Sequence, residues 1–98
     1  MPTVTRTELD EIDNFLTDLY QLEITRADQI TKPSGLHLMV PDPPQTTIEA
    51  GQRVLRIIIA AGAVAPVLAA FLKDPTPSLY RRVHGEVNEV RAILNLSA

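Results

Sequence analysis

Hydrophobic residues recur at helical spacing in two parts of this chain. In residues 7–22 they follow one another at intervals of three or four, at Leu9, Ile12, Leu16 and Leu19. Residues 77–96 show the same period, at Leu79, Val83, Val87, Val90 and Leu94. This spacing places the apolar side chains on one face of an α-helix. We therefore predict one amphipathic helix in each range.

Capping residues mark the starts of both helices. Glu8 stands three residues after Thr5, the spacing of a capping box, in which a hydroxyl and a carboxylate each accept a backbone N–H. Glu11 follows in the first turns, where the helix dipole favours negative charge. Before the second helix, Thr76 is followed by Pro77, which predicts an N-cap and a proline at the first helical position.

The segment between these helices, residues 47–73, is the most apolar part of the chain. From 54 to 72 it contains one charged residue, Arg56, and a second capping-box pattern at residues 46–49 would start a helix there. Gly62 and Pro66 interrupt the apolar run, since proline removes a helical hydrogen bond and clashes one turn back. We predict a helix over 47–73, broken or kinked near Gly62–Pro66 and antiparallel to the last helix, because the connection is short.

Residues 23–46 are less regular and contain four of the eight prolines. Residues 32–35 have proline and glycine at the positions that favour a type I turn. Apolar residues then alternate with other residues over 36–40, as in a half-buried strand, and residues 24–31 would supply its partner. We predict an irregular, proline-rich connection with a short β-hairpin within 24–40 that leans on a helix.

Composition agrees with one small helical domain. Ninety-eight residues provide room for a single hydrophobic core. The absence of cysteine excludes disulfides and thiolate metal sites. The expected fold is mainly α: a small bundle of three main helices that forms a single domain over residues 1–98.

The apolar middle segment has two interpretations, as the central helix of a soluble bundle or as a segment inserted into a bilayer. Its uncharged part, residues 57–72, has sixteen residues and would span about 24 Å as a helix, short of the hydrocarbon core of about 30 Å. The amphipathic helices at 7–22 and 77–96 each have an apolar face that needs an apolar partner, which favours the soluble bundle. The start of the chain lacks the pattern of a secretory signal. We therefore expect a cytoplasmic protein, with membrane association as the alternative.

Charge is distributed unevenly along the chain. The formal net charge is −3, but residues 1–50 carry three basic and nine acidic residues, a net of −6, and residues 51–98 carry six basic and three acidic ones, a net of +3. Few basic residues and few aromatic ones argue against a nucleic-acid binder. The two halves either form solvated surfaces or pair within the chain or between subunits. The candidates for pairing are Arg53, Arg56, Arg81, Arg82, Glu8, Glu11 and Asp18.

Small residues recur along the apolar segment. Ala61, Ala65 and Ala69 stand four residues apart, so that one side of a helix would allow another backbone to approach closely. This strip would receive either the last helix of the same chain or the surface of a partner.

No arrangement of residues predicts chemistry. The two histidines, His37 and His84, lie far apart in the sequence, and a zinc site needs three or four converging ligands. No nucleophile motif or phosphate-binding loop is present, so we expect no catalytic residues, no metal and no cofactor. We predict a non-enzymatic protein-interaction module, an adaptor, inhibitor or assembly component, that presents a helical face to another protein or to a second copy. The alternative is a small membrane-inserted protein that uses residues 57–72.

Overall fold

The structure is a computed structural model, which describes residues 4–31 and 42–97 and, among these, the side chains of residues 4–25 and 42–95. Its elements are α1 (Arg6–Thr31), α2 (Gln45–Ala60), α3 (Pro66–Lys73), the short 3-10 helix η1 (Pro77–Leu79) and α4 (Tyr80–Ser97). Within these two ranges no strand is present. The prediction of a mainly α-helical fold is confirmed.

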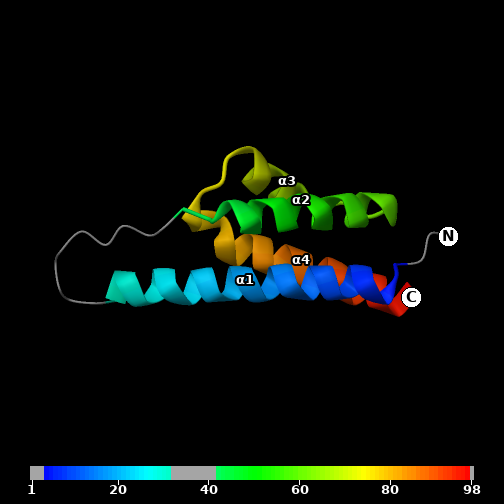
Figure 1. Ribbon diagram of the computed structural model, residues 1–98, viewed down its shortest axis with the longest axis horizontal. Helices are drawn as coiled ribbons and strands as arrows, with labels where there is room; N and C mark the ends of the chain where they lie inside the picture. The colour runs from blue at the N-terminus through cyan, green and yellow to red at the C-terminus, as the bar shows by residue number, and fades with distance from the viewer. Residues whose placement is uncertain (1–3, 32–41, 98) are drawn as a thin grey trace.

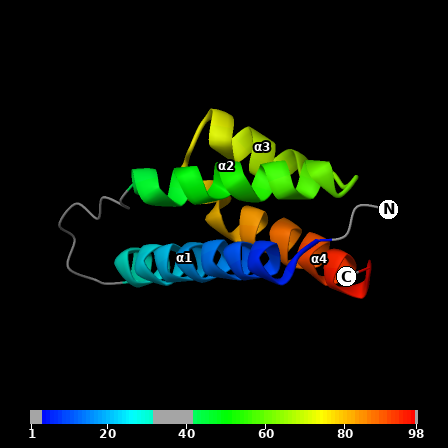
Figure 2. The same cartoon turned by 45° about the vertical axis from the view of Figure 1, so that its right-hand side comes forward.

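Successive helices run in opposite directions and pack on one another (Figures 1 and 2). α1 contacts α2, α2 contacts α3, and α3 contacts α4, which returns to lie along α1. The contact between α1 and α4 is the most extensive, and these two helices cover one side of α2 and α3. Short connections favour antiparallel neighbours of this kind.

One hydrophobic core joins the helices. The buried face of α1 contains the predicted stripe together with Phe15, which lies at its centre with no exposed surface. α2 and α3 contribute residues that include Val54, Ile58, Leu68 and Phe71, and all four are fully buried. The apolar middle segment is therefore covered on one side by the two amphipathic helices, α1 and α4, as expected from the sequence.

The predicted break in the middle segment is present, and its hydrogen bonds explain it. α2 ends at Ala60, and Gly62 has a φ of +83°, in the left-handed region that glycine adopts without a steric cost. The N–H of Gly62 bonds to the carbonyl of Ile59 at 2.9 Å, and that of Ala63 to Ile58 at 3.0 Å. These two bonds form a Schellman motif, which satisfies the last carbonyls of the helix.

The uncharged run at residues 57–72 is consequently divided between the end of α2, the turn and α3. Among the described residues, no helix combines the length and the apolar character needed to cross a membrane.

The predicted β-hairpin is wrong for the half of it that the structure describes. Residues 24–31 continue α1, which ends at Thr31 and not near residue 22. No glycine or proline occurs between residues 7 and 31, so nothing in the backbone stops the helix once it has started. The proposed second strand, at residues 36–40, lies outside the described residues.

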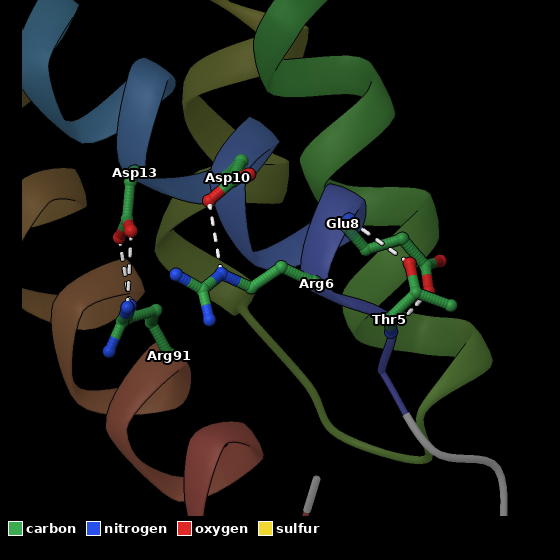
Figure 3. A network of polar contacts seen from close by, with 6 residues as sticks. All are labelled: Thr5, Arg6, Glu8, Asp10, Asp13 and Arg91. Atoms are coloured by element: carbon green, nitrogen blue, oxygen red, sulfur yellow. Dashed lines mark hydrogen bonds and ion pairs between the residues drawn. The ribbon is translucent and has the colours of Figure 1, made fainter.

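The two predicted capping boxes have different outcomes. At α1, the Thr5 N–H donates to Glu8 Oε1 at 2.9 Å and the Glu8 N–H donates to Thr5 Oγ1 at 3.1 Å (Figure 3). The box at residues 46–49 is not formed, because α2 begins earlier, at Gln45, after Pro44. The carbonyl of Pro44 accepts the N–H groups of Thr47 and Ile48, and the Thr47 side chain is buried.

Tyr80 provides a pH-dependent test of the core. Its side chain is fully buried, with its ring edge-to-face to Phe71 at a centroid distance of 6.0 Å. Burial, and to a lesser degree the charge of Asp42, raises the pKa of Tyr80 from 10.0 to about 12. Because the folded pKa is the higher one, the stabilisation that the neutral phenol provides is complete below pH 10 and is lost as the pH rises toward 12.

We expect phenolate absorbance from Tyr80 to develop near pH 12 in the folded protein. The Tyr20→Phe variant leaves Tyr80 as the single tyrosine, since the chain has two and no tryptophan. An ultraviolet pH titration of this variant measures the pKa directly. Titration at the ordinary value, while circular dichroism still shows a folded chain, would contradict the buried position.

Candidate interaction surface

An apolar groove lies on the outer side of the molecule, between α2 and α3. It has a volume of about 330 Å³ and is open to solvent. Its six lining residues are Leu55, Ile59, Val64, Ala65, Pro66 and Ala69. None of these side chains is polar, although Ile59 is 60% exposed and Val64 is 77% exposed. Exposed apolar area of this kind is a mark of an interaction site when it is contiguous.

The sequence produces the groove because the middle segment is apolar on more than one side. In α2, Val54 and Ile58 face the core, whereas Leu55 and Ile59 stand one turn apart on the side toward α3. The Gly62 turn reverses the chain. α3 therefore returns beside α2 (Figure 2), and its Ala69 forms the opposite wall with a side chain too small to fill the space.

Glu86, on α4, fixes the position of α3. Its carboxylate accepts the backbone N–H groups of Val67 at 3.0 Å and of Leu68 at 2.9 Å. Ala65, the N-cap residue of α3, has no side-chain acceptor for these groups. A carboxylate also interacts favourably with the positive end of the helix dipole. α4 thus holds the first turn of the helix that forms one wall of the groove.

The predicted strip of small residues is divided among three environments. Ala61 is the half-buried C-cap of α2, Ala65 is 4% exposed and belongs to the core, and Ala69 is exposed. Ala65 and Ala69 line the groove. The larger side chains of Ile59 and Val64, which sequence analysis did not single out, contribute more of its exposed surface.

Of the predicted arginines and carboxylates, one pair lies at ion-pair distance. Arg53 Nε lies 3.8 Å from Glu11 Oε1, which links α2 to α1. Arg56, on α2, and Arg81 and Arg82, on α4, are exposed, and within the described part of the chain no carboxylate lies at ion-pair distance from them. Of the other acidic candidates, Glu8 caps the start of α1 by accepting the N–H of Thr5, and Asp18 is exposed on α1.

Among the described side chains, the shortest ionic contact between helices joins two residues that were not predicted from the sequence. Arg91, on α4, donates two hydrogen bonds to Asp13, at 2.8 Å from Nε to Oδ1 and 3.1 Å from Nη2 to Oδ2 (Figure 3). These bonds, and then the charge of Asp13, raise the pKa of Arg91 above its ordinary value. A signal was present, since Arg91 stands one turn after Val87 and so borders the apolar stripe of α4.

A second hollow lies between α1 and α4. Tyr20 and His84, whose ring centroids are 6.2 Å apart, line it together with polar residues such as Asp13 and Asn88. His84 is half-buried against Tyr20. Among the side chains of residues 4–25 and 42–95, no three histidine or carboxylate groups converge on a point that could hold a metal ion.

Comparison of the chain with protein-family models, with curated proteins and with solved structures finds no match. The geometry defines a small, mainly α-helical protein whose most apolar segment is covered by helices on one side and forms an open groove on the other.

Proposed function

We propose that this protein is a non-enzymatic protein-interaction module, an adaptor, inhibitor or assembly component, that binds its partner in the groove between α2 and α3. The observation that carries the proposal is the exposure of Ile59 and Val64 beside four further apolar residues. Removal of apolar surface from water is worth about 25 cal/mol per Å², so a partner that covers this groove gains binding energy.

The character of the groove supports a binding function without catalysis. Its six side chains contain no titratable or nucleophilic group, so they offer apolar contact and no reaction chemistry. Among the side chains that the structure describes, the other large exposed hydrophobic ones lie on α1 and α4; these are Tyr20, Ile24 and Ile93. The partner is another protein or a second copy of this chain.

Val64→Asn is the variant that tests this proposal. Val64 is 77% exposed, so its replacement by a neutral polar residue should leave the fold intact. Loss of a valine side chain from an interface costs about 1.5–3 kcal/mol, which corresponds to tenfold or greater weakening. Ile93→Asn is the matched control, because Ile93 is 62% exposed on α4 and does not line the groove.

The measurement compares the proteins retained from a cell extract by the unmodified chain and by each variant, together with self-association measured by light scattering. The proposal predicts that a partner or a dimer is lost with Val64→Asn and kept with Ile93→Asn. An interaction that survives Val64→Asn unchanged would exclude the groove as its site.

A further inference from the structure

We infer that the groove binds an amphipathic helix of a different protein, with acidic residues along the edges of its apolar stripe. This inference rests on the proposed function and specifies the partner. The groove is open and apolar, and it follows two antiparallel helices. It has none of the converging polar groups that orient a small molecule. Such a groove suits a helix that inserts apolar side chains at i, i+3, i+4 and i+7.

Helical spacing places one cation beside each wall of the groove, since Arg56 stands one turn before Ile59 and Lys73 one turn after Ala69. Arg56 also adjoins Leu55 on α2, and both cations are exposed. Among the described residues, neither has a carboxylate at ion-pair distance. The closest acidic residues along the two helices are Glu49, seven residues and about 10 Å before Arg56, and Asp74, the C-cap of α3, which directly follows Lys73 in the sequence.

These two cations would select a partner by charge. Electrostatic complementarity at the rim of an interface contributes specificity more than affinity. A helix with glutamate or aspartate beside its apolar stripe would place carboxylates near Arg56 and Lys73. A helix with basic edges would instead meet two like charges, which disfavours binding.

A second copy of the chain meets these requirements poorly. Its acidic helix, α1, has already buried its apolar stripe, with Ile12, Phe15 and Leu19 fully inaccessible. A different protein can instead present an acidic helix whose apolar stripe is still uncovered.

Three fluorescein-labelled synthetic peptides test the inference. Each has about 15 residues, roughly four helical turns, and the same leucine stripe, with edges of glutamate, glutamine or lysine. Fluorescence anisotropy measures the dissociation constant of each. We expect the glutamate peptide to bind about tenfold more tightly than the lysine peptide. The net charge of the protein, −3, favours the lysine peptide, so a preference for glutamate reports the local charges.

Charge variants test whether Arg56 and Lys73 cause the preference for the glutamate peptide. In the double variant Arg56→Glu/Lys73→Glu, the tighter binding of the glutamate peptide over the lysine peptide should disappear or reverse. The control Arg81→Glu/Arg82→Glu, which changes the net charge by the same amount at two exposed positions of α4, should leave it intact. Circular dichroism of each variant confirms that the helices are present. Equal binding of the three peptides, or a glutamate preference that survives the double variant, would overturn the inference.

Two further results separate this inference from the proposed function. If no peptide binds but light scattering shows a dimer that Val64→Asn dissociates, the groove binds a second copy, and the acidic partner is wrong while the interaction function stands. If the peptides bind equally well to Val64→Asn and to the unmodified chain, the groove is not the site and both proposals fail.

Discussion

Phe15→Ala should lower the free energy of unfolding by about 3–5 kcal/mol, the range for removal of a fully buried phenylalanine. Phe15 has no exposed surface, and its ring lies where α1 meets α2. A Cβ at Gly51 would lie 3.1 Å from that ring and 2.9 Å from Leu72 Cδ2. The glycine therefore allows the helices to approach closely around Phe15, and little can move in to fill the space that alanine would leave.

Urea denaturation followed by circular dichroism measures this loss. Small domains have a total stability of about 5–15 kcal/mol, so the variant should unfold at a much lower urea concentration. Tyr20→Ala is the control, since Tyr20 lies on the same helix but is 56% exposed; its loss should stay below about 1 kcal/mol. Equal losses for the two variants would contradict the packing of α1 on α2.

Glu86→Ala should lower the free energy of unfolding by about 2–3 kcal/mol. Two backbone N–H groups at the start of α3 donate to this carboxylate, and hydrogen bonds to charged groups contribute about 1.5–3 kcal/mol. Ala65 offers no replacement acceptor. Glu86→Gln should lower the free energy of unfolding by roughly half as much, because glutamine keeps one oxygen acceptor but loses the charge.

Glu89→Ala is the matched control for Glu86. It removes an exposed carboxylate from the same helix and should change the stability by less than about 0.5 kcal/mol. Because α3 forms a wall of the groove, Glu86→Ala should also weaken peptide binding, although Glu86 does not line the groove. If Glu86→Ala and Glu89→Ala unfold at the same urea concentration, α4 does not fix α3 in this way.

The features that could be predicted from sequence are local ones. Apolar residues at helical spacing fixed the buried faces of α1 and α4, and Gly62 with Pro66 indicated the break between α2 and α3. The failed predictions concern where a helix begins, as at residues 46–49, or where it ends, as at residues 24–31. Residues 24–31 were assigned to a strand because an alternating pattern followed them, yet no residue before Pro33 interrupts helical hydrogen bonding.

Long-range contacts were beyond the sequence pattern. Glu86 caps a helix 18 and 19 residues away, and Arg91 binds Asp13 across 78 residues. The start of α3 did contain a signal, since Ala65 before Pro66 leaves N–H groups that require an acceptor from another element.

The groove could be predicted only in part. The sequence identified 47–73 as the most apolar part of the chain and indicated a strip of small residues that would receive the last helix or a partner. Which side stays uncovered depends on how α1 and α4 pack, and the segment is apolar on several sides. For this reason the spacing of small residues indicated Ala61 as an interaction candidate, whereas nothing in the sequence indicated Ile59.

The central claim is that the groove between α2 and α3 is the binding surface, and nitrogen–proton correlation NMR tests it most directly. The labelled protein is titrated with the glutamate-edged peptide. We predict that the largest shift changes fall on amides around Ile59, Val64 and Ala69, and that Val64→Asn reduces them. Shift changes centred instead on Tyr20 and His84, between α1 and α4, would contradict the claim.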